Sequence, residues 1–412
     1  IDSAAQPLAP DDRITAASIL LENGRIAEAQ AIVSELRDVA QPDQQVLFLS
    51  GALYFIGGRY DEAAAEFRRM LTRDPTLVRP RLELARALYM SGQYEAARYH
   101  FEQTLAAPLP EQVRRNILGY LDAIREHLPT FAFSLDLVSD SNPKQATTSR
   151  VVQIGNLLFQ LNDSARAREA QGVLLTGQGR YPLPADNSLF LRGYVEYYDY
   201  AGRDLDLLYA QALGGKHVNL GGHGVDIETG GHAAIYAGKT LYSGAIGRVS
   251  DFIRLAPALG LNLALDAKQL DYADYPFLDG WQHTASADLR RALDSRSSIS
   301  GGIAFTLGTA REQAYAFERP ALMLRYLREW QGGWISSLSW QGAHFHFGGV
   351  DPFFGSVRTD RENLAEFGIV NRRLSYKGFS PRLTLGYADR RSNIELYSYH
   401  RAYLRVGLVS EF

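Results

Sequence analysis

Hydrophobic and polar residues alternate along most of the second half of the chain. Leucines stand at every second position from 259 to 265, and glycine, asparagine and alanine fill the positions between them. Residues 189–197, 299–307 and 404–412 alternate in the same way. A period of two predicts strands rather than helices. Thirteen interruptions between residues 140 and 398 divide the pattern into fourteen predicted antiparallel strands.

The first half repeats with a period of 34 residues. The segments GRIAEA, GRYDEA and GQYEAA begin at residues 24, 58 and 92. Helical hairpins of the tetratricopeptide type have this period. Small residues recur in phase at Ala17, Gly51 and Ala85, where two helices must approach closely. Residues 110–127 show one more amphipathic pattern, which predicts a helix that caps the stack.

The composition of the chain changes near Pro129. Only 6 of the 37 glycines precede residue 130, and all four tryptophans follow it. We therefore predict an α + β chain of two domains. Residues 1–129 form a tetratricopeptide domain of three repeats plus a capping helix, and residues 130–412 form a 14-stranded antiparallel β-barrel.

One helical face of the repeats is a candidate binding groove. Positions 48, 52 and 55 share a helical stripe, and a shift of 34 residues places them over positions 82, 86 and 89. An apolar floor with two arginines suits a polypeptide segment. The alternative is that these side chains pack within the domain or are ordinary solvated residues. The candidate groove residues are Phe48, Ala52, Phe55, Arg79, Leu82, Arg86 and Tyr89.

Charge and cysteine content exclude several functions. The 43 basic and 46 acidic residues leave a net charge of -3, which gives no electrostatic argument for a nucleic-acid partner. Cysteine is absent, so no disulfide, thiolate metal site or thiol nucleophile can form. The start of the chain has no charged segment followed by an apolar one, and we expect that any signal peptide has been removed. The longest uncharged run, residues 330–350, is interrupted by serines, glutamines and glycines, so a membrane crossing would use strands.

The size of the predicted barrel indicates which face of the strands meets lipid. Fourteen strands enclose more space than side chains can fill, so the lumen would hold water and the apolar face would point outward. An even number of strands keeps both ends of the barrel on one side, with the repeats in the periplasm and loops 141–168 and 347–358 outside the cell. The predicted lumen-facing charges are Asp136, Arg192, Glu196, Asp266, Asp288, Arg290, Arg325, Arg382 and Arg405.

The end of the chain is similar to the closing-strand signal that outer-membrane barrels present to their assembly machinery. The residues that carry this likeness are Arg405, Gly407 and the terminal Phe412, whereas Ser410 departs from it because a large apolar residue is usual there. The alternative is that Phe412 only anchors the strand at the lipid boundary. The expected partners are therefore the barrel-assembly machinery and outer-membrane lipid.

The chain resembles the surface lipoprotein assembly modulator (Slam) family, also described as the type XI secretion outer-membrane translocators. The specific segments are DSNPKQAT from residue 140, DPFFGSVRTDRE from residue 351, and the closing FSPRLTLGYADRRSNIELYSYHRAYLRVGLVSEF. Where such proteins tend to read Ser-Asn-Ile-Asn, this chain has Ser-Asn-Pro-Lys at 141–144. The resemblance implies an outer-membrane protein that moves client proteins, lipid-anchored or soluble, from periplasm to cell surface. The repeats would engage the client, and the barrel would offer its pore or a lateral seam.

Two other functions compete with this interpretation. An outer-membrane hydrolase lacks support, because no G-x-S-x-G, H-E-x-x-H or Walker motif occurs. His344 and His346 share a strand face, but a metal site needs three or four ligands, so we expect no metal, no cofactor and no enzymatic activity. An exopolysaccharide export porin would need a lumen of one sign. The predicted lumen mixes four acidic and five basic residues, which favours a protein client.

Overall fold

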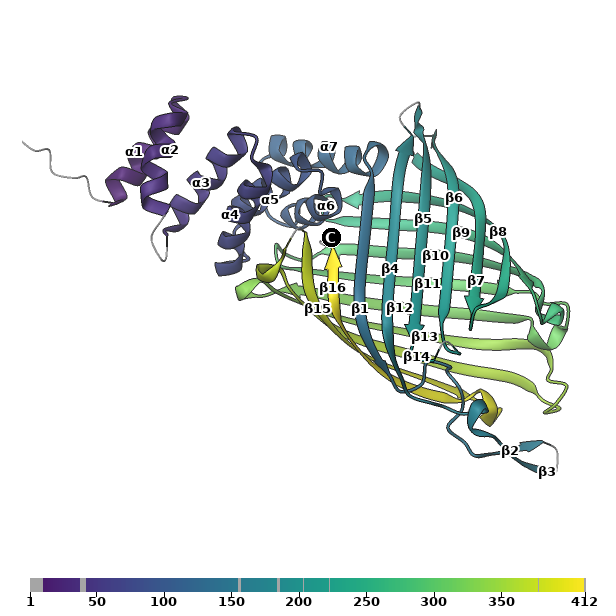
Figure 1. Ribbon diagram of the computed structural model, residues 1–412. Helices are drawn as coiled ribbons and strands as arrows, with labels where there is room; N and C mark the ends of the chain where they lie inside the picture. The colour runs from purple at the N-terminus through teal and green to yellow at the C-terminus, as the bar shows by residue number, and fades with distance from the viewer. Residues whose placement is uncertain are drawn as a thin grey trace, which may run out of the picture.

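The computed structural model describes residues 10–37, 42–154, 157–183, 186–202, 204–221, 223–376 and 378–410. A helical domain precedes a closed barrel (Figure 1). The helices are α1 (Pro10–Glu22), α2 (Ile26–Arg37), α3 (Gln44–Ile56), α4 (Tyr60–Arg73), α5 (Val78–Met90), α6 (Tyr94–Thr104) and α7 (Glu111–His127). None of the described helices is long and apolar enough to cross a membrane.

The helical domain consists of the three predicted hairpins and the predicted capping helix α7. Each hairpin turns at a glycine with positive φ, namely Gly24 at 74°, Gly58 at 73° and Gly92 at 81°. Side chains other than glycine rarely adopt this conformation, which explains why the repeat keeps glycine there. Gly51 also keeps its place for a steric reason, because an added Cβ would lie 2.8 Å from the Phe67 ring. The predicted tetratricopeptide architecture is confirmed.

The barrel contains fourteen antiparallel strands, as predicted. Their order is β1-β16-β15-β14-β13-β12-β11-β10-β9-β8-β7-β6-β5-β4, and β4 pairs again with β1. The strands are β1 (Thr130–Asp140), β4 (Ala170–Leu183), β5 (Asp186–Tyr200), β6 (Leu207–Leu220), β7 (His223–Tyr236), β8 (Lys239–Ala256), β9 (Leu259–Tyr272), β10 (Gly280–Ala292), β11 (Ser297–Gly308), β12 (Phe317–Glu329), β13 (Trp334–Val350), β14 (Val357–Asn371), β15 (Phe379–Ser392) and β16 (Tyr399–Ser410).

The apolar face of the strands points out of the barrel. Leu137 is 67% exposed and Leu265 is 62% exposed, whereas Asp136, the neighbour of Leu137, is fully buried. A surface of exposed leucine, isoleucine and phenylalanine around charged inner rows would be unstable in water and suits lipid. The barrel therefore has the lipid-facing orientation that the sequence pattern predicts.

Two local features differ from a simple reading of the sequence. The long loop after β1 contains a separate hairpin, β2 (Val151–Ile154) and β3 (Leu157–Gln160), which the alternation pattern does not reveal. Tyr198 and Tyr200 look like members of an aromatic girdle at the membrane boundary, but the structure places them inside, where their rings stack with centroids 5.7 Å apart. They alternate with the outer row of β5, so they cannot share the lipid face.

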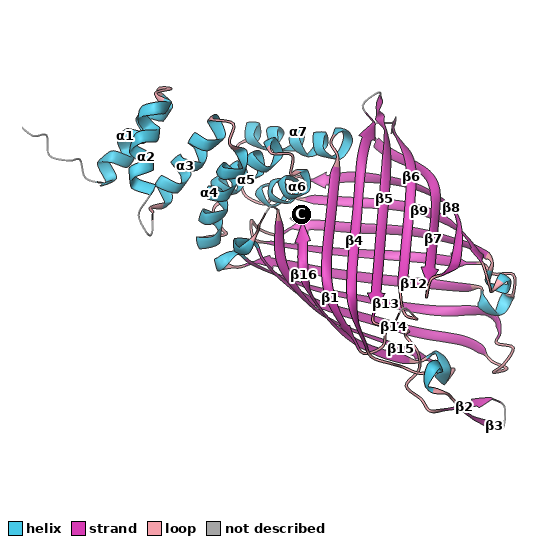
Figure 2. Ribbon diagram, viewed as in Figure 1, coloured by secondary structure: helices cyan, strands magenta, loops and turns pink. Residues whose placement is uncertain are grey.

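The helical domain lies at the end of the barrel where β1 begins and β16 ends (Figure 2). The turns β8–β9, β10–β11, β12–β13 and β14–β15 lie at this same end. The β2–β3 hairpin lies at the opposite end.

Candidate functional site

The predicted groove residues lie on α3 and α5, which face each other across one side of the stack. The Arg79 guanidinium lies 4.7 Å from the centroid of the Phe48 ring, and that of Arg86 lies 5.0 Å from the Phe55 centroid. Arg86 also forms an ion pair with Glu83 at 2.9 Å. Each arginine of α5 therefore covers an aromatic ring of α3.

The other candidate groove residues are half-buried against the same core. Ala52 lies between the two phenylalanines of α3, and Leu82 and Tyr89 pack against the core cluster beneath α5. The Tyr89 ring lies 4.8 Å from that of Tyr120 on α7, edge to face. The result is a stripe of partly exposed rings and two guanidinium groups, which can contact both apolar and acidic side chains of a peptide.

The nine predicted lumen charges all lie on the inner rows of the barrel. The strand register shows that their side chains share the inner face of the barrel. For example, Asp136 of β1 stands opposite Gly407 of β16, and Arg405 of β16 stands opposite Val138 of β1. Several of them are paired: Asp136 with Arg382, Arg192 with Glu228 at 2.8 Å, Asp266 with Arg248 at 3.4 Å, Arg290 with Glu102 at 3.4 Å, and Arg405 with Glu366 at 3.6 Å. Glu196 accepts a hydrogen bond from the Tyr194 hydroxyl. Asp288 and Arg325 lie on the same rows.

A cavity of about 590 Å³ lies within the lumen against strands β10 to β16. Its wall contains basic, acidic and aromatic side chains. The guanidinium groups of Arg319 and Arg390 each lie 5.1 Å from the centroid of the Phe345 ring, and Arg390 forms an ion pair with Glu362. Gln145, from the loop after β1, reaches this cavity and accepts a hydrogen bond from the Tyr399 hydroxyl. The lumen is thus polar, mixed in sign and partly open.

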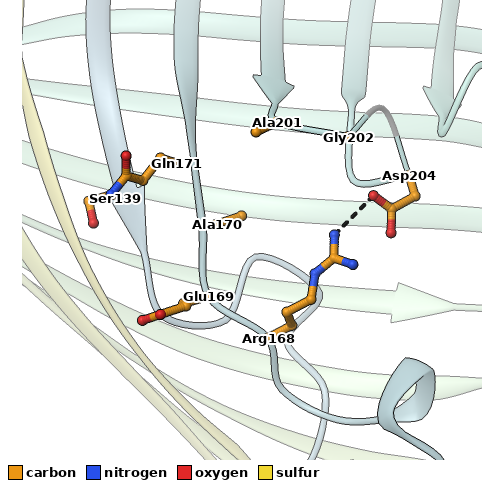
Figure 3. A pocket seen from close by; sticks show the side chains of 8 residues that line it. All are labelled: Ser139, Arg168, Glu169, Ala170, Gln171, Ala201, Gly202 and Asp204. Carbon is orange, nitrogen blue, oxygen red and sulfur yellow. Dashed lines mark hydrogen bonds and ion pairs between the residues drawn. The ribbon is translucent and has the colours of Figure 1, made fainter.

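Another pocket lies at the end of the barrel opposite the helical domain, outside the lumen (Figure 3). It has a volume of about 740 Å³, and Arg168 and Asp204 form an ion pair of 2.9 Å on its wall. Ser139 and Gln171 also line it and stand opposite each other on the lipid-facing rows of β1 and β4. Two carboxylates, Glu169 and Asp204, and one guanidinium, Arg168, line this pocket, and Arg168 is already paired with Asp204.

The structure gives a reason for the glycine and the serine near the end of the closing strand, β16. Gly407 lies in the inner row, and an added Cβ would come within 2.0 Å of the Leu135 carbonyl oxygen of β1. Ser410, which departs from the usual signal, accepts a hydrogen bond from the Phe133 amide with its hydroxyl at 2.8 Å. The polar residue therefore helps to hold the seam between β1 and β16. Phe412 lies outside the described residues.

His344 and His346, which share a strand face in the sequence pattern, lie on β13. Both are exposed and lie on an outer row of this strand. Among the described residues, no group of three or more histidine, aspartate or glutamate side chains could hold a metal ion.

A buried ionic cluster between the two domains was not predicted from the sequence. Arg81 of α5, fully buried, pairs with Glu329 at the end of β12 at 2.5 Å. Glu329 also accepts hydrogen bonds from Tyr99 of α6 at 2.9 Å and from Arg372 at 3.1 Å. Burial and the neighbouring guanidinium groups of Arg372 and Arg81 hold the pKa of His100 well below its ordinary value, so the ring is neutral.

The 34-residue repeat could have revealed the arginine of this cluster, but not its partner. A shift of 34 residues places Arg81 on Leu47, which is fully buried in the core of the second repeat. A cation at a core position requires a buried partner. That partner, Glu329, is 248 residues away in the sequence. Neither the 34-residue repeat nor the two-residue alternation of the strands connects it to Arg81.

Comparison with known proteins gives concordant results for both domains. Residues 208–412 match the family model described as Surface lipoprotein assembly modifier, and residues 14–77 and 54–112 match tetratricopeptide models. Surface lipoprotein assembly modifier 1 of Neisseria meningitidis serogroup B is 26% identical over 92% of this chain and 78% of its own length. Surface lipoprotein assembly modifier of Moraxella catarrhalis is 25% identical over 84% and 68%. Hemophilin secretion modulator of Acinetobacter baumannii is 26% identical over 36% of this chain and 31% of its own length.

Proposed function

Because the chain belongs to the surface lipoprotein assembly modifier family, we propose that it translocates specific client proteins across the outer membrane to the cell surface. Relatives along most of the chain are named for assembling surface lipoproteins, and one partial relative is named for secretion of hemophilin. One observation carries the proposal: tetratricopeptide-type helices, which suit peptide binding, are attached to one mouth of a barrel whose outer face suits lipid. The clients would be surface lipoproteins or small secreted proteins.

The two domains would have separate tasks. Residues 1–129 would lie in the periplasm and hold the client against the groove formed by Phe48, Phe55, Arg79 and Arg86. The rings of this groove would contact apolar side chains of the client, and its guanidinium groups would bind acidic ones. Residues 130–412 would provide the route, through the lumen or beside it.

Partners other than the client follow from the closing strand and the outer wall. The inner-row Arg405 and Gly407, together with the terminal Phe412, would present the closing strand to the barrel-assembly machinery. Outer-membrane lipid would surround the exposed leucine and phenylalanine rows. The chain would carry no catalytic centre, because transport here needs binding and a route and no bond is made or broken.

Export of an exopolysaccharide is the weaker alternative. A single-sign lumen would guide a charged polymer, whereas this lumen pairs its arginines with carboxylates along strands β1, β5, β7, β14 and β15. An outer-membrane hydrolase has no support from any motif. The named relatives favour neither of these functions.

Protease shaving of whole cells followed by mass spectrometry tests the proposal for any client, whatever its identity. Cells that express the full chain should release peptides of at least one protein that cells lacking it retain inside. The double variant Arg79→Glu with Arg86→Glu should abolish this difference, while Arg25→Glu with Arg115→Glu, on exposed positions away from the groove, should preserve it. An identical surface proteome with and without the chain would refute translocation. A wild-type result for the groove variant would refute only the role of the groove.

A further inference from the structure

Helices α6 and α7 lie across the inner mouth of the barrel. Asp122 of α7 pairs with Arg254 of β8, Glu102 of α6 pairs with Arg290 of β10, and Tyr99 of α6 bonds to Glu329 of β12. The two residues after α7 lead directly into β1. Five strand-to-strand steps separate β1 from β8 in the barrel order, and four more separate β8 from β12. The two helices therefore contact the rim at β8, β10 and β12 and are joined to it at β1, beside the end of the barrel where β1 begins (Figure 2).

The contacts on the β12 side are buried and multiple. Glu329 receives Arg81, Tyr99 and Arg372, and the Arg372 guanidinium also lies 4.6 Å from the centroid of the Tyr99 ring. Arg81 further donates to the Pro75 carbonyl at 2.7 Å. Removal of any member would leave an uncompensated buried charge or donor, so this side resists separation.

The ion pairs on the β8–β10 side are longer and only partly buried. The Asp122–Arg254 distance is 3.7 Å and the Glu102–Arg290 distance is 3.4 Å, with Asp122 and Arg290 each 53% exposed. The Arg125 guanidinium adds a hydrogen bond of 3.2 Å to the Phe252 carbonyl. Exposed ion pairs contribute little to stability, because water replaces each partner almost equally well.

Both arginines on this side belong to the inner rows of the barrel. Arg254 of β8 and Arg290 of β10 stand on either side of Gly260 of β9, each opposite it in the strand register. All three residues therefore share the inner face of the barrel. The acidic residues of α6 and α7 thus neutralise cations at the lumen entrance. Without these two carboxylates, Arg254 and Arg290 would be left unneutralised at the entrance.

We propose that α6 and α7 form a lid on the periplasmic mouth, which swings about an axis from residues 128–129 to Glu329 and opens on the β8–β10 side. The proposal deepens the proposed function, because it names the step that admits a client to the lumen. A static plug would need comparable burial around the whole rim. The contrast between a buried side and an exposed side instead defines a hinge and a free edge.

Conductance of the purified full chain in planar bilayers, with potassium chloride as the probe, tests the lid without any client. Glu102→Arg with Asp122→Arg replaces attraction at the free edge by repulsion and should raise the open probability severalfold. The matched control, Glu62→Arg with Glu111→Arg, makes the same charge change on the helices, at residues whose ion pairs within the described part of the chain lie in the helical domain. Equal conductance of the two variants would overturn the proposal.

A reversible cross-link provides a second test of the lid. The chain has no cysteine, so Glu102→Cys with Arg290→Cys can be joined by a bifunctional methanethiosulfonate reagent and released by reductant. The cross-link should abolish openings, and reductant should restore them. Thr76→Cys with Ser295→Cys, at a contact beside the hinge, should leave openings intact when cross-linked. Openings that persist in the first variant, or vanish in both, would contradict a hinged lid.

The same cross-linked cells, analysed by surface shaving, separate the two proposals. If the reduced Glu102→Cys with Arg290→Cys variant shows no client at the surface although its conductance responds to the cross-link, translocation fails and the lid stands. If clients reach the surface equally in the cross-linked and reduced states, the lid does not gate their passage and this inference fails alone.

Discussion

The helical domain and the barrel place the same residue types in opposite positions. Phe101 of α6 is fully buried in the core of the repeats, whereas Leu265 at the middle of β9 is 62% exposed. Charges follow the reverse rule: every arginine of the helices except Arg81 is at least partly exposed, while the barrel holds Asp136 and Arg382 inside. The difference shows that each domain sorts its side chains for its own solvent, water outside the helices and hydrocarbon outside the strands.

The first test applies one kind of truncation to both domains. Phe101→Ala should lower the free energy of unfolding of the helical domain by about 3–5 kcal/mol, because it leaves a cavity among buried side chains. Leu265→Ala should have a far smaller effect, since lipid tails can fill the space. Denaturant titration followed by the far-UV helical signal measures the former, and heat-modifiable gel mobility of the folded barrel measures the latter. Equal effects would mean that the row containing Leu265 does not face lipid.

The second test targets the junction, where both domains share one buried cluster. Glu329→Gln removes the charge that compensates Arg81 and Arg372, and should destabilise the helical domain in the full chain by about 3–5 kcal/mol. Glu318→Gln makes the same change on an exposed residue of the same strand and should be nearly silent. The far-UV helical signal in denaturant distinguishes the two variants. If both behave like wild type, the junction does not stabilise the repeats.

The periodicities predicted the two domains well because each depends on local sequence. The 34-residue period fixes the positions of glycines 24, 58 and 92, and the period of two fixes which side of each strand meets lipid. These are properties of neighbouring residues, so they can be recognised before any tertiary contact is known. The nine lumen charges were predicted by the same rule, because residues at every second position of a strand share one face.

The junction and the hinge could not be predicted because they depend on tertiary contacts. Arg81 occupies a core phase of the repeat, but nothing in the sequence near Glu329 marks it as its partner. Likewise, parity places Arg290 in the lumen yet gives no indication that Glu102 of a helix neutralises it. The β2–β3 hairpin was missed because each of its strands has only four residues, too few for a periodic signal.

The third test adds a charge to each face of one strand. Leu265→Arg places a cation in the middle of the lipid-facing row and should cost about 2–4 kcal/mol of barrel stability. Asn262→Arg, on the inner row of the same strand, should cost much less because its guanidinium can reach lumen water. The fraction of heat-modifiable, folded barrel in outer-membrane preparations measures both. A stable Leu265→Arg barrel with an unstable Asn262→Arg barrel would reverse the assignment of the two faces.

The fourth test uses pH at the junction. His100 contacts Arg81 through Nδ1 at 3.2 Å and Arg372 through Nε2 at 3.4 Å, and the Arg68 charge also lies nearby; Glu329 and Tyr99 complete its surroundings. Because its pKa is lowered in the folded state, the unfolded chain binds a proton first as pH falls. Stability is therefore full above a pH of about 6.5 and should decline below it by up to about 1.4 kcal/mol per pH unit.

The variant His100→Gln provides the control for this pH dependence. It keeps a group that can accept a hydrogen bond from either arginine but does not titrate. Helical unfolding measured between neutral and mildly acidic pH should show a flatter profile for the variant than for the parent chain. A parent profile as flat as that of the variant would show that His100 is not neutral and buried in the working protein.

The smallest effect is expected at the free edge of the lid, and its smallness is itself informative. Asp122→Asn removes one charge from a pair that is 3.7 Å long and half exposed, so it should change the free energy of unfolding by no more than about 1 kcal/mol. Glu329→Gln, which also removes a single negative charge beside an arginine, should cost several times more. Measured in one denaturant series, the ratio of these two effects reports how unequally the helical domain is fastened to the two sides of the barrel mouth. A ratio near one would mean that the domain is held uniformly, and a domain held uniformly has no side from which to open.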